Sequence, residues 1–161
     1  MVKHAFLLLL VVGCAVDNPP TQVGALDHEY FRCNVQPVIA ARCAFPACHG
    51  TRVRPLAIFA PGRERLRVTW DRPTEPVSQD ELDANFKLVT GFTTLDATGE
   101  PWLLSKPLAT SAGGYYHRGA DLYGNDDVFM TKDDAGYQNL EKWIAGQTAQ
   151  STCAPTTMVG P

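Results

Sequence analysis

The sequence has no concentrated basic segment and none of the familiar catalytic motifs. Its 14 lysines and arginines are outnumbered by 17 aspartates and glutamates, which gives a formal net charge of −3. Nucleic-acid-binding proteins usually carry a strongly basic face, so we expect no nucleic-acid partner. The chain also lacks a phosphate-binding loop, a Ser/His/Asp arrangement and a zinc pattern of usual spacing. These absences predict a protein that is not an enzyme.

Long apolar runs are missing as well. Residues 5–12 form an uncharged apolar run behind the basic residue Lys3. This run is too short to span a bilayer, which takes roughly 20 apolar residues, but it has the length of a signal-peptide core. Directly after it, residues 11–14 read Val-Val-Gly-Cys and resemble the bacterial lipobox. In a lipobox, cleavage precedes a cysteine whose sulfur carries diacylglycerol.

That resemblance implies a lipoprotein signal peptide at residues 1–13 and a lipid anchor on Cys14. An ordinary secretory signal is the alternative. Residues 14–26 then form a flexible tether, and we place a single domain at 27–153 with a disordered tail at 154–161. We expect an exported protein, lipid-anchored to a bacterial membrane on its periplasmic or cell-surface side.

Helical periodicity predicts three main helices. The first covers residues 27–43, begins at the N-cap Asp27, and is kinked or divided by Pro37, which lacks a donor N–H. The second begins with a capping box, in which Ser78 is the cap and Glu81 follows three residues later. It ends at Gly91.

The third helix runs from about Asp133 to Ile144 and ends at Gly146. Between the helices we expect a short helix and turn at 101–108 and an extended piece at 65–70. The remaining segments are long, and 12 prolines and 13 glycines make them rich in loops. Such long loops need something to pack against in a compact domain. The fold class is therefore mainly α, with a large apolar cofactor completing the core.

One motif carries specific chemistry. Cys43 and Cys48 are followed at once by His49, the arrangement that attaches c-type haem. Each thiol adds across a vinyl group of the porphyrin to form a thioether, and the histidine becomes the proximal iron ligand. Four residues separate the cysteines instead of the usual two, and Pro46 would stiffen the longer loop. A Cys43–Cys48 disulfide is the alternative.

Several segments, in order, resemble small c-type cytochrome domains of planctomycete-type and myxobacterial secreted proteins. The resemblance extends over roughly residues 28–147. A helix of the form V-x-P-I-L leads into the cysteines, and later segments resemble S-L-L-x-K-P-L, G-G-x-x-H-x-G-G and Y-x-x-L-x-x-W-I-x-G. Ala120 replaces the last glycine of the third pattern. The resemblance implies a class I cytochrome c-like fold, with three main helices and long loops around one covalent haem c. It also implies that Tyr137 and Trp143 are core aromatics.

The resemblance leaves the distal iron ligand open. His117 lies in the Gly-rich segment, where glycines would let the backbone approach the haem, and we prefer it to Met130. His28 is close to the tether and Met158 lies in the tail, so both are less suitable. Two imidazoles would give a lower reduction potential than a His/Met pair. An open sixth position that senses a small gas is a further alternative.

Cys33 and Cys153 remain, one in the first helix and one just beyond the last. If those helices pack together, an oxidising compartment favours a bridge between the two cysteines. Chain-entropy arguments put the stabilisation from such a long loop at roughly 5 kcal/mol.

These features together predict a membrane-anchored mono-haem cytochrome that transfers single electrons between redox proteins in the cell envelope. The alternative is a haem-free, disulfide-bonded envelope lipoprotein with a structural or binding role. A group of carboxylates does not fit the EF-hand spacing and is a solvated surface or a docking face for a basic redox partner. The group comprises Asp121, Asp126, Asp127, Asp133 and Asp134.

Overall fold

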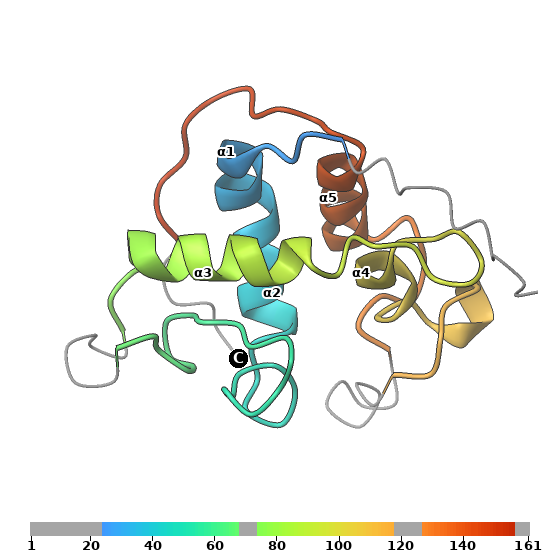
Figure 1. Cartoon of the computed structure of the whole chain (residues 1–161), viewed down its shortest axis with the longest axis horizontal. Coiled ribbons are helices and arrows are strands. Elements are labelled where there is room, and N and C mark those ends of the chain that lie inside the picture. Colours follow the sequence, from blue (N-terminus) through green and yellow to red (C-terminus); the bar gives the residue numbers. More distant parts are fainter. Residues whose placement is uncertain (1–23, 68–73, 118–126, 157–161) are drawn as a thin grey trace, which may run out of the picture.

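The computed structural model describes residues 24–67, 74–117 and 127–156 (Figure 1). Across these ranges the chain is mainly helical, which confirms the predicted class. Pairing between extended segments is confined there to two isolated bridges, Leu95 with Pro101 and Leu108 with Phe129. Residues 65–67 of the predicted extended piece form no strand, and the rest of that piece lies outside the described residues. Also outside are the signal segment, Cys14, Ala120, Asp121, Asp126 and Met158.

The first helix is continuous but changes its winding ahead of Pro37. It consists of α1 (His28–Tyr30), the π-helical turn η1 (Phe31–Val35) and α2 (Gln36–Arg42). The Gln36 N–H bonds to the Phe31 carbonyl, which is the wider π pattern. Pro37 falls in the first turn of α2, where a missing N–H is tolerated. The sequence predicted a kink or a division at Pro37, and the structure shows a change of winding just ahead of it in a helix that stays continuous.

The second long helix, α3 (Gln79–Thr90), begins with the predicted capping box. The Ser78 side chain accepts from the Glu81 N–H, and the Glu81 side chain accepts from the Ser78 N–H. Gly91 is the C-cap. Both ends of α3 therefore follow from residues adjacent to it in the sequence.

Two short elements and one longer helix follow. They are α4 (Trp102–Ser105), the 3-10 turn η2 (Thr110–Ala112) and α5 (Ala135–Ile144). The Asp134 side chain caps α5 by accepting from the N–H groups of Gly136 and Tyr137. Gly146 adopts a φ of +85°, a left-handed conformation that ends the helix as predicted.

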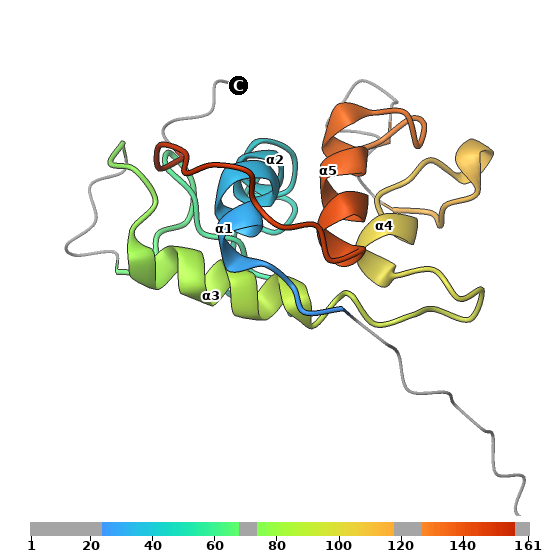
Figure 2. The ribbon, with the colours of Figure 1, turned by 90° about the horizontal axis from the view of Figure 1, so that it is seen from above.

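An aromatic cluster holds the first helix, α3 and α5 together (Figures 1 and 2). The Phe31 ring lies 5.3 Å from Phe86 and 5.2 Å from Trp143, and Phe86 lies 5.8 Å from Trp143. Phe31 and Trp143 are fully buried. The Trp143 indole N–H donates to the Asp27 carbonyl at 3.0 Å, which satisfies the polar atom of this buried ring.

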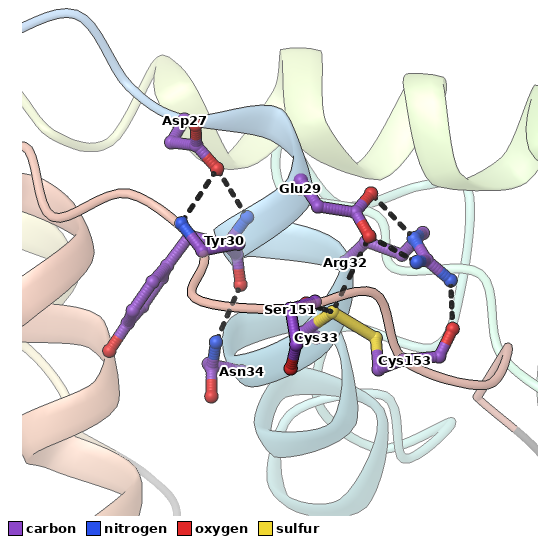
Figure 3. The surroundings of a disulfide bond; sticks show 9 residues. Asp27, Glu29, Tyr30, Arg32, Cys33, Asn34, Ser151 and Cys153 are labelled. Atoms are coloured by element: carbon purple, nitrogen blue, oxygen red, sulfur yellow. Dashed lines mark hydrogen bonds and ion pairs between the residues drawn. A yellow bond between two sulfur atoms is a disulfide. The ribbon is translucent and has the colours of Figure 1, made fainter.

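The chain beyond α5 returns over the first helix and is bonded to it (Figure 3). Cys33 and Cys153, the pair expected from the sequence, form a disulfide with Cα atoms 5.5 Å apart. Arg32 donates to the Cys153 carbonyl at 2.5 Å. The Thr156 carbonyl accepts from the Val77 N–H at 3.1 Å, so residues 154–156 of the predicted tail pack beside the start of α3.

Candidate cofactor site

A cavity of about 290 Å³ opens between the C-terminal end of α2, α4 and the segment that leads to His117. Most of its wall is apolar and comes from loops. This volume lies just below the range of roughly 300–1,000 Å³ in which proteins usually hold small organic ligands. The apolar wall includes Leu56, Phe92, Leu103, Pro107 and Val128.

Four chemically active side chains line this same cavity: Cys43, Cys48, His49 and His117. Three of them belong to the cysteine–histidine motif, and the fourth lies far along the chain. The structure thus brings His117 to the motif. We call these four side chains the donor set.

The loop that carries the motif is closed by its own backbone. The His49 N–H bonds to the Cys43 carbonyl at 3.0 Å, and the Cys48 and Gly50 N–H groups both bond to the Phe45 carbonyl at 2.8 Å. A Cβ at Gly50 would lie 2.1 Å from the Ala44 carbonyl oxygen, so this close approach requires glycine. The four-residue gap between the cysteines therefore folds into a compact, hydrogen-bonded turn.

Both cysteines of the motif are free and partly buried. Burial, reinforced by the neighbouring Cys48, raises the pKa of the Cys43 thiol to about 12. Burial also raises the pKa of Cys48, while the positive charge of Arg54 opposes that shift. Both sulfurs are therefore thiols at neutral pH, and the two are not bonded to each other in this structure.

His49 is held in one orientation by a backbone carbonyl. Its Nδ1 lies 2.9 Å from the Leu56 carbonyl oxygen, which can only accept, so Nδ1 carries the proton and Nε2 has the free lone pair. Burial lowers the pKa of His49, and the Arg54 charge acts in the same direction. The imidazole is thus neutral at pH 7 and oriented by an outer hydrogen bond, as metal-ligating histidines usually are.

His117 faces His49. Their ring centroids are 6.0 Å apart and the ring planes differ by 17°. Burial lowers the pKa of His117, as do the charges of His49 and Lys106, while Asp127 opposes them. The buried Nδ1 of His117 has no hydrogen-bond partner within the described chain. An unpartnered buried nitrogen costs free energy, and such groups are commonly functional.

Glycines set the path of the chain toward His117. Gly113 has a φ of +92°, and a Cβ at Gly114 would lie 1.9 Å from the Leu108 carbonyl oxygen. The Tyr115 N–H then bonds to the Ser105 carbonyl at 3.0 Å, which ties the segment to the end of α4. From the sequence we expected these glycines to let the backbone approach a haem. The structure instead shows Gly114 approaching the protein's own backbone.

The ligand atoms of the donor set are spread around the cavity and do not meet at one position where a single ion could bind them all. No three of its ligand atoms lie within 4.8 Å of one another in the described part of the chain. Among the described residues, Glu29, Cys33 and Cys153 do have ligand atoms within 4.8 Å of one another, but the two sulfurs are already bonded to each other. A bare zinc ion needs ligands at about 2.0–2.3 Å, so the cavity is better suited to a larger group that spans it.

The other sequence candidates lie elsewhere. Met130 is 47% exposed and does not line the cavity; it lies in an adjoining, open depression of about 460 Å³ that shares Arg42 and Val128 with the cavity. Asp127, Asp133 and Asp134 line the same depression. His28 lies 3.1 Å from a carboxylate oxygen of Asp83.

The two candidate core aromatics pack inside the protein. Trp143 contacts Phe31 of the first helix, and Tyr137 packs 5.8 Å from Phe129. Neither ring lines the cavity.

Sequence reasoning missed two residues that shape the site. Leu56 supplies the carbonyl that orients His49, yet it lies in an irregular segment with no periodic pattern. Arg42 fixes the end of α2 by donating to the Val128 carbonyl at 3.0 Å and to Asp134 at 2.9 Å. In the sequence, the position of Arg42 directly before Cys43 was the one feature that could have indicated its role in the site.

The chain matches no family model, no curated protein and no solved structure. The functional argument therefore depends on the cavity and its donor set.

Proposed function

We propose that the chain is a membrane-anchored mono-haem c-type cytochrome that transfers single electrons in the cell envelope. The observation that carries this proposal is the donor set, because two free thiols and two facing, neutral imidazoles line one apolar cavity. An envelope location is supported by the signal segment and by the disulfide. Among the described residues, none of the helices has the length and apolarity to cross a membrane.

The donor set fits a haem c. Cys43 and Cys48 have free sulfurs that can form the two thioethers, and the hydrogen-bonded turn fixes their separation. Imidazole nitrogens bind metals at about 2 Å, so rings 6.0 Å apart leave room for an ion between them. The apolar wall would cover the porphyrin faces. These observations support His49 as proximal ligand and favour His117 over Met130 as distal ligand.

When bound, the haem iron supplies a centre that gains or loses one electron. The chain's own residues hold and orient it. The Leu56 carbonyl keeps His49 Nε2 available, and the turn from Cys43 to Gly50 fixes the imidazole beside both sulfurs. Ligation by two imidazoles would give a lower reduction potential than ligation by histidine and methionine. These roles are those of an electron carrier and involve no catalytic group.

The test is to produce the full chain in a bacterium that matures c-type cytochromes and to stain the denatured protein for haem. Covalent haem survives denaturation, so we expect a stained band. Oxidised and reduced absorption spectra of His117→Ala and Met130→Ala then identify the distal ligand. We expect His117→Ala to lose the six-coordinate, low-spin spectrum and Met130→Ala to keep it.

A colourless wild-type band would overturn the proposal and favour the haem-free envelope lipoprotein. A stained band whose six-coordinate spectrum survives in His117→Ala would keep the cytochrome and refute its distal ligand. A wild-type spectrum that is already five-coordinate would point to an open position suited to a small gas.

A further inference from the structure

A buried segment without regular secondary structure packs against the cysteine–histidine motif. Residues 56–60 are all less than a tenth exposed, and none of them belongs to a helix or a strand. Leu56, the first of them, also lines the cavity. A buried backbone outside helices and strands must find its hydrogen-bond partners elsewhere, so the partners of this segment decide where it lies.

The first half of the segment is bonded to His49. The Leu56 carbonyl accepts from Nδ1 of His49 at 2.9 Å, and the Ile58 N–H donates to the His49 carbonyl at 2.7 Å. A shift of about 1 Å would take the Leu56 carbonyl out of hydrogen-bonding distance. The imidazole therefore keeps its orientation only while this part of the segment keeps its place.

The second half of the segment is bonded to one carboxamide on α3. The Phe59 N–H donates to Asn85 Oδ1 at 2.9 Å, and Asn85 Nδ2 donates to the Phe59 carbonyl at 2.8 Å. A single side chain thus pairs with both polar groups of one backbone residue. A carboxamide can do this because it carries an acceptor oxygen and a donor nitrogen on one planar group. An aliphatic side chain at this position would remove both bonds.

A second buried carboxamide supports the first. Asn85 Nδ2 also donates to Gln36 Oε1 at 3.0 Å, and Gln36 begins α2, the helix that ends beside Cys43. The Asn85 and Gln36 residues are 0% and 1% exposed. Burying polar groups is unfavourable unless they are hydrogen-bonded, and here their bonds go to the segment that holds His49. We call Asn85 and Gln36 the amide clamp.

We propose that Asn85 is a positioning residue for His49. Its carboxamide fixes Phe59, and through the 56–60 segment it holds the Leu56 carbonyl where that carbonyl accepts the Nδ1 proton. Neither residue of the amide clamp lines the cavity, so both act through the segment and not on a ligand. This inference rests on the proposed function in assigning iron to Nε2, whereas the fixed orientation of the imidazole does not depend on it.

The first test measures how fast the Nδ1 proton of His49 exchanges with solvent, by NMR on the full chain labelled with ¹⁵N-histidine. Asn85→Leu keeps the approximate size of the side chain and removes its bonds to Phe59. We expect the exchange to become about tenfold faster, because the net contribution of one hydrogen bond corresponds to up to about that factor. An unchanged rate would overturn the proposal.

The matched control is Val89→Ala, a truncation at a fully buried position of the same helix. It lowers the stability of α3 and leaves both carboxamides of the amide clamp in place. We expect its Nδ1 proton to exchange at close to the wild-type rate. If Val89→Ala and Asn85→Leu accelerate the exchange alike, Asn85 acts only through stability, and the positioning role is refuted.

A milder variant decides the matter if Asn85→Leu does not fold. Gln36→Leu removes the outer partner of Asn85 and leaves its two bonds to Phe59. We expect a smaller acceleration of the exchange, about threefold. No acceleration beyond that of Val89→Ala would overturn the proposal.

The reduction potential of the haem form provides a second readout that stability alone would not move. A hydrogen bond from the outer ring nitrogen makes an imidazole a stronger donor to its metal, and a stronger donor favours the oxidised iron. Weakening the bond to the Leu56 carbonyl should therefore raise the potential in Asn85→Leu and leave it unchanged in Val89→Ala. Equal potentials in Asn85→Leu and wild type would contradict the positioning role.

The positioning role and the proposed function can fail separately. A colourless protein in which Asn85→Leu still accelerates the exchange would end the cytochrome proposal and keep the role of Asn85. A haem-stained protein in which Asn85→Leu changes neither the exchange nor the potential would keep the cytochrome and end the role of Asn85.

Discussion

The two cysteine pairs of the described chain occupy contrasting regions of the molecule. Cys33 and Cys153 are bonded to each other beside the aromatic cluster that joins the first helix to α5. Cys43 and Cys48 are unbonded and line a cavity built largely from loops. The sulfurs of the first pair are used up in bonding to each other, whereas the sulfurs of the second pair are available to bond something else.

One polar group from each region shows a related difference. In the helical region, the Trp143 N–H is satisfied by the Asp27 carbonyl. In the cavity region, the buried His117 Nδ1 has no partner in the described chain. A buried nitrogen without a hydrogen-bond partner costs free energy, and a bound ligand could supply that partner. Stability and ligand binding should therefore be separable by mutation.

The largest expected effect separates the two cysteine pairs. Cys33→Ala/Cys153→Ala removes a cross-link over 120 residues and should lower the free energy of unfolding by up to about 5 kcal/mol. Cys43→Ala/Cys48→Ala should cost only about 1 kcal/mol, a typical value for small truncations. Urea denaturation of haem-free protein measures both values.

Haem staining completes this prediction. The first double variant should keep covalent haem and the second should lose it. Equal losses of stability in the two variants would show that the regions are not independent.

A tryptophan pair sharpens the comparison at a somewhat smaller scale. Trp143→Ala removes a fully buried ring and should cost about 4 kcal/mol, because large-to-small core substitutions leave cavities. Trp102→Ala removes a ring that is 37% exposed at the cavity, and it should cost about 1 kcal/mol. Thermal and urea unfolding curves decide the matter, and a reversed order would contradict the assignment of the core to the helical region.

A buried ion pair gives the third prediction. Glu81 accepts from Arg65 twice at 2.8 Å, and the two side chains are 0% and 6% exposed. Glu81→Gln should cost about 3 kcal/mol at pH 7 because it removes the carboxylate charge from a buried ion pair. The neighbouring Asp80, on the same helix, pairs with Arg67 at the surface. Asp80→Asn should therefore cost at most about 1 kcal/mol.

The Glu81 effect should also depend on pH. Burial alone would raise the pKa of Glu81, but the hydrogen bonds from Arg65, Leu66 and Ser78 outweigh it and hold the pKa below 4.5. A lowered folded pKa means that this stabilisation is present above 4.5 and lost as the pH falls through the folded value. The stability difference between wild type and Glu81→Gln should shrink in acid, and a constant difference would contradict the ion-pair assignment.

The parts of the fold that could be predicted depend on neighbouring residues. The capping box at Ser78 and the left-handed Gly146 are set by contacts within a few residues, so the helix ends follow from the sequence. A disturbance of the helix near Pro37 could be predicted from its missing N–H, whereas the π form of the preceding turn could not. The extended piece at 65–70 failed over its described part because alternation in so short a segment is a weak signal.

Only the part of the candidate site that is local in sequence could be predicted. Cys43, Cys48 and His49 are adjacent in sequence and form a recognisable unit. The position of His117 beside His49, and of Met130 away from it, depends on how loops fold back over α4. The carbonyl partner of His49 and the Arg65–Glu81 pair likewise join segments that no local pattern connects.

The Cys33–Cys153 bond makes the intervening chain a covalent ring. The entire donor set lies within that ring, as do the long loops around it. A protease that cuts once inside the ring opens it without releasing a fragment, since both pieces stay joined through the disulfide. A cofactor held by Cys43 and Cys48 would then stay covalently attached to the rest of the molecule after such a cut. Against proteolysis, the bond would thus protect the integrity of the molecule as well as the stability of its fold.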